Sequence, residues 1–77
     1  MPTILRIGPY RFHFYSAEGN EPPHIHIERD DLECKFWLQP VTLASNYGFP
    51  GAELNKLAEL VRLHQIELTQ AWQQYHG

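Results

Sequence analysis

The hydrophobic pattern of this 77-residue chain changes its period once, from two residues in the first half to about 3.6 residues in the second. Apolar and polar residues alternate in four early segments, and such alternation is typical of β-strands with one buried face. The four segments are residues 3–7, 10–15, 24–29 and 32–38. Over residues 51–75 the apolar residues instead fall on one stripe of a helix. The sequence therefore predicts a single α+β domain over residues 1–77, with four strands and one long C-terminal helix.

Short turns join the predicted strands in pairs, so we expect an antiparallel meander in chain order. Gly8-Pro9 separates the first two strands and Asp30-Asp31 the last two, whereas residues 41–49, after Pro40, are expected to form a loop. One face of this sheet is apolar, and the helix is the only element available to cover it. The expected register pairs Leu5 with Phe12, Ile7 with Tyr10, Ile25 with Phe36, Ile27 with Cys34, His13 with His26 and Tyr15 with His24, and sets Ile4 beside His13.

Composition and charge limit the classes of function. The net charge is −3 with neutral histidines, which argues against a generally basic nucleic-acid binder. The single cysteine, Cys34, excludes an internal disulfide and is expected in the core. The N-terminus lacks the apolar core of a signal peptide and no segment approaches the roughly 18 apolar residues of a membrane span, so we expect a cytoplasmic protein that is not bound to membrane.

The small size of the chain also bears on its assembly. A domain of 77 residues buries only about 60% of the surface that its unfolded chain exposes, so its stability is expected to be marginal. A free edge at the first or the fourth predicted strand would suit pairing across a two-fold axis. A homodimer is therefore one expected form of the protein.

The segment Pro22-Pro23-His24-Ile25-His26-Ile27-Glu28 carries the clearest chemical signal. Because successive side chains of a strand point to opposite faces, His24, His26 and Glu28 share one face while the isoleucines face the core. Side chains two residues apart lie roughly 6.5–7 Å from each other, a separation that two imidazoles can close around a metal ion, a phosphate or a proton relay. The segment therefore predicts a functional face opposite the apolar one.

That polar face is unusually rich in charged and aromatic residues. It is expected to carry Arg6, Arg11, His13, Tyr15, His24, His26, Glu28, Glu33, Lys35 and Trp37. A metal site here would use His24 and His26 with Glu28 or His13, since neutral imidazoles and a carboxylate suit Zn²⁺. Lys35 nearby would oppose a cation.

A ribonuclease site is a second possibility on the same face. It would use His13, His24 and His26 as general acid and base. The residues available to bind the phosphates of an RNA are Arg6, Arg11 and Lys35, and those available to stack on a base are Tyr15 and Trp37.

Protein recognition is a third possibility, with Trp37 and Tyr15 as aromatic anchors of an interface. Against all three stands the simpler interpretation that His13, His24 and His26 are half-exposed strand residues stacked on aromatic neighbours. The surrounding charges would then form a solvated network of small energetic value.

Several segments carry a resemblance to a known family. They are residues 1–8, 10–16, 18–30 and 35–38, together with Gly48-Phe49 and Glu53-Leu54. The chain resembles the small bacterial domain-of-unknown-function family 4160 over nearly its whole length, most specifically in Gly-Asn-Glu-Pro-Pro-His-Ile-His at residues 19–26. Asp31 stands where this family commonly has glycine, and Pro50-Gly51 replaces its usual serine-type helix cap, two departures that affect a turn and a cap.

The resemblance implies no established reaction, cofactor or catalytic residue. It does imply a component of a compact two-gene unit of toxin–antitoxin type, often beside a small protein of domain-of-unknown-function family 2442. We therefore expect first a protein-interaction domain that binds the neighbouring gene's product through the face carrying His13, His24, His26 and Trp37. The alternative is a histidine-dependent ribonuclease or metal-binding enzyme that uses the same face.

Overall fold

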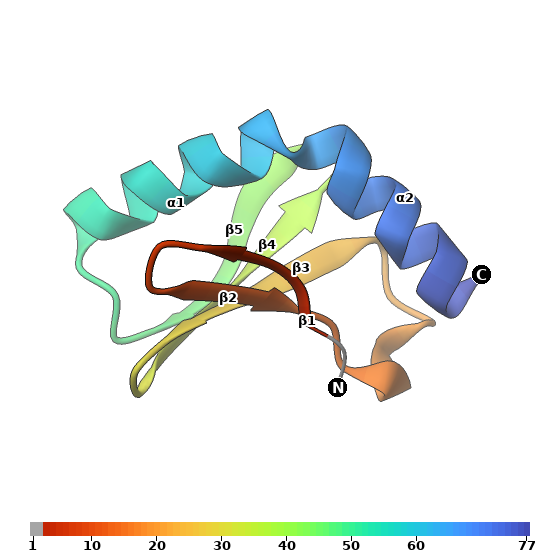
Figure 1. The fold of residues 1–77 in the computed structure, drawn as a ribbon, viewed down its shortest axis with the longest axis horizontal. Helices are drawn as coiled ribbons and strands as arrows, with labels where there is room; N and C mark the ends of the chain where they lie inside the picture. The colour runs from red at the N-terminus through yellow and green to blue at the C-terminus, as the bar shows by residue number, and fades with distance from the viewer. Residues whose placement is uncertain (1–2) are drawn as a thin grey trace.

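The computed structural model describes residues 3–77, which form one antiparallel sheet of five strands with two helices over one face (Figure 1). The strands are β1 (Thr3–Ile7), β2 (Tyr10–His13), β3 (His24–Arg29), β4 (Leu32–Leu38) and β5 (Val41–Tyr47). The other elements are the 3₁₀ turn η1 (Ser16–Glu18) and the helices α1 (Gly51–Leu63) and α2 (Gln65–His76). The sheet order is β1-β2-β3-β4-β5. The predicted α+β class and meander order are confirmed, whereas four strands and one long helix are wrong.

The register of the central strands is the one that the apolar alternation predicts. The structure pairs His13 with His26, Ile25 with Phe36 and Ile27 with Cys34. At the first edge, however, the register shifts between Thr3 and Leu5, so that Thr3 rather than Ile4 lies opposite His13.

The second strand is also shorter than predicted. β2 ends at His13, so Tyr15 does not pair with His24 in the ladder. Tyr15 remains extended but leaves the sheet to enter η1, which begins at the next residue. The chain must turn there to cross back to β3.

The segment expected to be a loop is the edge strand β5. Val41 pairs with Leu38 and Leu43 with Phe36, after which the register shifts by one residue at Ala44. That shift interrupts the alternation, which is why the sequence pattern alone does not identify the strand. Gly48 ends β5 at a φ of 104°, and a Cβ atom at this position would lie 2.6 Å from the Leu32 side chain, so glycine is required there.

The predicted long helix is divided at His64. Its backbone leaves the helical region (φ −108°, ψ 16°), and its Nδ1 donates a hydrogen bond to the Leu60 carbonyl at 3.0 Å. α1 then packs against β4 and β5, and α2 against β3 and β4, so the two halves cover different parts of the twisted sheet (Figure 1). No helix within residues 3–77 is long and apolar enough to cross a membrane.

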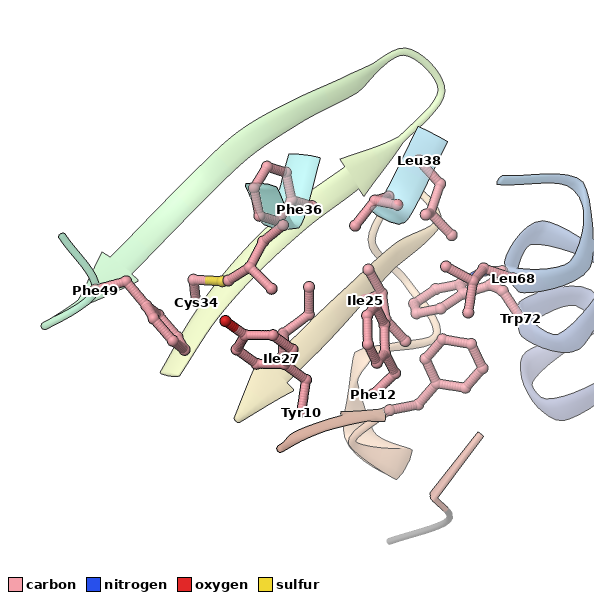
Figure 2. Close-up of a cluster of buried hydrophobic side chains, with 13 residues drawn as sticks. Tyr10, Phe12, Ile25, Ile27, Cys34, Phe36, Leu38, Phe49, Leu68 and Trp72 are labelled. Carbon is pink, nitrogen blue, oxygen red and sulfur yellow. The ribbon is translucent and has the colours of Figure 1, made fainter. Parts of the chain in front are cut away.

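The core lies between the sheet and the helices (Figure 2). Its buried members include most of the apolar face that alternation predicts. They are Tyr10, Phe12, Phe14, Ile25, Ile27, Cys34, Phe36, Leu38, Phe49, Leu57, Val61, Leu68 and Trp72. Burial raises the pKa of the Cys34 thiol to about 12, so this cysteine is a small apolar residue and not a nucleophile.

A polar cluster joins the start of α1 to the sheet. Glu53 accepts hydrogen bonds from Nε and Nη2 of Arg29 at 2.7 and 2.8 Å, and from the Tyr10 hydroxyl at 2.6 Å. The Arg29 and Tyr10 hydrogen bonds lower the pKa of Glu53 to about 2. Because Glu53 is ionised, the cluster holds the first turn of α1 over β2 and β3.

Replacing Leu57 by alanine is expected to lower the free energy of unfolding by about 2–5 kcal/mol, because truncating a fully buried leucine leaves a cavity. Leu63→Ala in the same helix is the matched control. Leu63 is 76% exposed, so its truncation should change the free energy by no more than about 0.5 kcal/mol. Urea denaturation followed by circular dichroism measures both, and equal losses would contradict the orientation of α1.

Acid is expected to weaken the fold partly through Glu53. Its pKa falls from the usual 4.5 to about 2 on folding, so its contribution to stability is complete above about pH 4.5 and is lost as the pH falls toward 2. The urea midpoint should therefore drop more between about pH 6 and about pH 3 in the wild type than in Glu53→Gln. Parallel pH profiles of the two proteins would show that this carboxylate contributes nothing.

Candidate functional site

The polar face of the sheet is partly covered by the segment between β2 and β3. This segment contains η1 and ends in Pro22-Pro23, whose fixed φ angles lead the chain into β3. The Pro23 carbonyl accepts a hydrogen bond from the Leu38 backbone at 3.0 Å, which ties the start of β3 to the end of β4. His24 is fully buried as a result and His26 is 7% exposed. The prediction of half-exposed histidines on an open face is therefore wrong.

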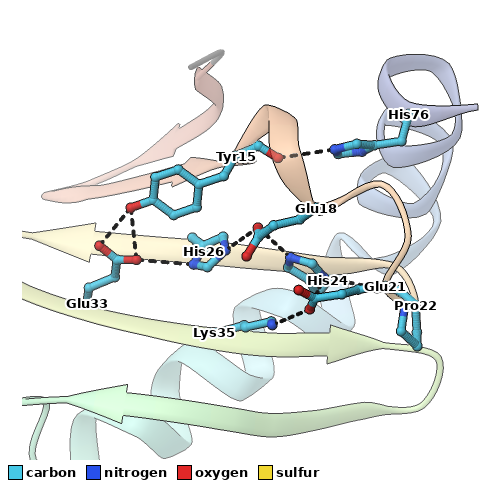
Figure 3. A network of polar contacts seen from close by, with 9 residues as sticks. All are labelled: Tyr15, Glu18, Glu21, Pro22, His24, His26, Glu33, Lys35 and His76. Carbon is cyan, nitrogen blue, oxygen red and sulfur yellow. Dashed lines mark hydrogen bonds and ion pairs between the residues drawn. The ribbon is translucent and has the colours of Figure 1, made fainter.

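Three side chains that carry possible metal-ligand atoms meet beneath this segment (Figure 3). His24 and His26 project from the same face of β3, and Glu18 reaches them from the end of η1. Oε1 of Glu18 lies 2.7 Å from Nε2 of His24 and 2.7 Å from Nε2 of His26. Within residues 3–77, these three residues form the cluster whose ligand atoms all lie within 4.8 Å of one another.

The other nitrogen of each ring has its own acceptor. Nδ1 of His24 donates to the Pro22 carbonyl at 2.9 Å, and Nδ1 of His26 donates to Oε2 of Glu33 at 3.1 Å. The Tyr15 hydroxyl lies 3.1 Å from both oxygens of Glu33 and so holds that carboxylate in place. Both imidazoles are thus oriented by outer partners, as the histidine ligands of metal ions are.

These contacts determine where the ring protons lie. A carbonyl and a carboxylate only accept hydrogen bonds, so Nδ1 carries the proton in both His24 and His26. In the neutral rings, each Nε2 is then a lone pair directed at Oε1 of Glu18. A carboxylate oxygen 2.7 Å from two such lone pairs is repelled by both unless a cation lies among them, either as protons on the rings or as a metal ion.

The electrostatics of Glu18 and Tyr15 follow from the same contacts. Burial by itself would raise the pKa of the Glu18 carboxyl, but the hydrogen bonds with His24 and His26 outweigh it and the net shift is downward. Burial, with the nearby Glu33 charge, raises the pKa of the Tyr15 hydroxyl. Glu18 is therefore a carboxylate and Tyr15 a neutral hydrogen-bond donor.

Two of the three predicted cationic residues of this face, Lys35 and Arg11, are engaged by acidic partners. Nζ of Lys35 donates to Glu21 at 2.6 Å and lies 4.6 Å from the centre of the Trp37 ring. Arg11 lies 3.5 Å from Glu28.

The predicted metal ligand Glu28 and the predicted phosphate-binding residue Arg6 lie apart from the cluster. Glu28 pairs with Arg11 and faces Glu33 across the strands, so it does not join the two histidines. Arg6 lies on the edge strand β1, opposite Arg11 of β2, and is exposed. The structure thus brings together His24, His26 and Glu18, and separates them from Glu28 and Arg6.

His13 lies beside this cluster without joining it. Its ring stacks on His26 with centroids 5.6 Å apart and meets Tyr15 edge-on at 5.0 Å. It is fully buried, and neither ring nitrogen has a hydrogen-bond partner in the part of the chain described. Burial, helped by Arg11, lowers the pKa of His13, so the ring is neutral and packs as one wall of the site.

Three further residues of the site come from outside the paired strands, where strand alternation cannot place them. Glu18 lies in the connection between strands, six residues before His24, where no period constrains a side chain. Trp72 comes from α2 and lies 4.6 Å from the His24 ring, while His76 donates to the Tyr15 carbonyl at 3.2 Å. The acidic Glu-Gly-Asn-Glu run just before Pro22-Pro23 was the available signal for Glu18.

Comparisons with known proteins agree with the resemblance noted in the sequence. No curated protein and no solved structure matches the chain. A family model described as "Domain of unknown function (DUF4160)" matches residues 10–73, which include all three members of the cluster. The chain therefore belongs to the DUF4160 family.

Proposed function

We propose that the protein binds one divalent transition-metal ion of the Zn²⁺ class through Nε2 of His24, Nε2 of His26 and Oε1 of Glu18. The observation that carries this proposal is the convergence of Nε2 of His24, Nε2 of His26 and Oε1 of Glu18, with the opposite nitrogen of each ring already engaged. An imidazole–carboxylate hydrogen bond of the Glu33–His26 kind is a common outer contact of zinc ligands.

Accepting an ion requires a movement of the Glu18 carboxylate. Zinc bonds to nitrogen and oxygen are about 2.0–2.1 Å long, which puts tetrahedral ligand atoms about 3.3 Å apart. Glu18 lies 2.7 Å from each ring nitrogen, so its oxygen must withdraw by about half an ångström to admit the ion. Glu18 ends a short 3₁₀ turn and precedes Gly19, a position that allows this movement.

The surrounding charge also supports a cation. Three carboxylates lie in or beside the site, against one basic side chain that is paired with a carboxylate. The carboxylates are those of Glu18, Glu21 and Glu33, and the cation is Lys35. A divalent ion would balance this excess of negative charge, whereas a bare phosphate would be repelled.

This arrangement favours a metal-dependent enzyme over a metal-free ribonuclease. A ribonuclease of the metal-free type needs free imidazoles near free phosphate-binding cations, but here the rings face Glu18 and the cations face carboxylates. Two histidines and one glutamate leave a coordination position open, as in catalytic zinc sites, where the ion activates water for hydrolysis. The proposed reaction class is therefore metal-assisted hydrolysis, with RNA as one substrate to test.

Titration with Zn²⁺ is expected to load one ion per chain and to shift the ring-proton NMR signals of His24 and His26. Glu18→Gln should abolish tight binding, because it removes a ligand charge. Glu33→Gln should weaken it by about 10–100-fold through loss of the outer contact to His26. Isothermal titration calorimetry measures the affinities, and tryptophan fluorescence provides a second readout, because Trp37 and Trp72 both lie against His24.

Glu28→Gln is the matched control for Glu18→Gln. It removes the same charge from a more exposed glutamate of the same face, so the metal affinity should stay within a few-fold of the wild type. Circular dichroism shows whether each variant folds. Equal zinc affinity in the wild type and in Glu18→Gln would refute the proposed ligand set.

Protein recognition is the second candidate function, and one observation favours it. Tyr47 is 69% exposed and lies opposite Glu33, on the same polar face as the half-buried Trp37. Exposed aromatic side chains of this kind are typical anchors of interfaces. The proposed partner is the small protein of a neighbouring bacterial gene, bound in the cytoplasm as in a toxin–antitoxin pair. His13 and His24 are fully buried, so they would support this interface from behind and not touch the partner.

A pull-down with the neighbouring gene's product is expected to recover a complex that Trp37→Ala and Tyr47→Ala each weaken at least about 10-fold. Tyr75→Ala is the control, because Tyr75 is also partly exposed but lies on α2, away from the polar face. Surface plasmon resonance gives the affinities. No binding by the wild type, or equal binding by all variants, would remove this candidate.

A further inference from the structure

The edge strand β5 differs from the other strands of the sheet in its charge. β5 has no charged residue, whereas each of the other four strands carries at least one. The outer side of β5 also has no strand partner within residues 3–77. Edge strands usually carry charges that prevent pairing with another chain. An uncharged edge strand is therefore available for pairing.

A groove runs beside this edge on the helical side of the sheet. Its volume is about 450 Å³, and Leu43, which is 45% exposed, lies at its side. The apolar residues that line it are Phe36, Val41, Leu43, Leu54 and Ala58, and Arg62 lies at its rim. The groove is an opening in the core between β5 and α1 that a second apolar surface would close.

We propose that this surface binds a second copy of the chain, with the two β5 strands pairing antiparallel across a two-fold axis. The register shift at Ala44 leaves the Val41–Leu43 part as the regular pairing segment. An axis at Thr42 puts the two Thr42 side chains opposite each other and sets Val41 of each copy beside Leu43 of the other. The apolar pair lies on the groove side, so the grooves of the two copies meet.

Charge explains why the occupant is a second copy. A two-fold axis places each residue near its own kind, which is unfavourable for a charged strand and harmless for an uncharged one. β1, the other edge, has Arg6 near its centre and is less suited to self-pairing. Glu59 and Arg62 form an exposed ion pair on α1, and antiparallel α1 helices across the axis would set each of these residues near its opposite charge.

The test measures molecular mass by analytical ultracentrifugation over a range of protein concentrations. The wild type is expected to reach twice the 9.0 kDa of the single chain. Thr42→Lys and Thr42→Glu should each weaken dimerisation at least about 10-fold, because like charges then meet at the axis. Thr42 is exposed in the single chain, so both variants should fold, as circular dichroism will show.

Mixing the two variants tests directly whether the Thr42 residues of the two copies meet at the axis. In a heterodimer the introduced charges of Thr42→Lys and Thr42→Glu are opposite, so an equimolar mixture should recover a dimer that neither variant forms alone at the same concentration. Leu63→Lys is the control, since this exposed residue does not line the groove and its change should leave the mass unchanged.

Three results would overturn the proposal. One is a wild type that stays monomeric at every concentration. Another is a dimer that neither Thr42 variant weakens, which would place the interface elsewhere. The third is a monomer that forms a Thr42-sensitive complex only with the neighbouring gene's product, which would make a different protein the occupant. None of these measurements depends on metal, so they leave the proposed metal centre untouched.

Discussion

The alternation of side chains along β3 is the constraint on which the rest of the structure depends. Ile25 and Ile27 enter the core from one face of this central strand, while His24 and His26 leave from the other. A shift of one residue in the register would expose the isoleucines and bury the imidazoles among apolar side chains, so the burial of the core also determines where the two rings lie. The same strand therefore positions both the core and the candidate site.

The need to satisfy buried polar groups explains the path of the chain around that site. Two buried imidazoles require partners for four ring nitrogens, and the segment after β2 supplies most of them through Glu18 and the Pro22 carbonyl. Glu33 supplies the remaining one from β4. The result is a connected network from Tyr15 to Pro22 in which the Nε2 atoms converge on one carboxylate oxygen (Figure 3). Such convergence is costly in neutral rings and favourable around a cation.

Because the helix is divided at His64, its two halves pack against different parts of the sheet. α1 covers β4 and β5 and is attached to β3 by the Glu53–Arg29 pair, but it leaves a groove at the sheet edge. α2 covers β3 and β4 and ends against the connection that carries Glu18. Trp72 thus contacts both Phe14 of the core and His24 of the site, so the packing of α2 and the position of His24 depend on each other.

The sequence by itself determined the α+β class and the apolar pairs within each hairpin, because alternation and short turns are local, and a meander in chain order then pairs His13 with His26. It also placed His24 and His26 on one face. Only the tertiary structure decided that Glu18 rather than Glu28 meets these rings, that β5 forms the edge and that the helix divides at His64. The physical reason is that a connection and an edge strand take their conformations from the surfaces they cover. The periodicity of the sequence does not reveal those contacts.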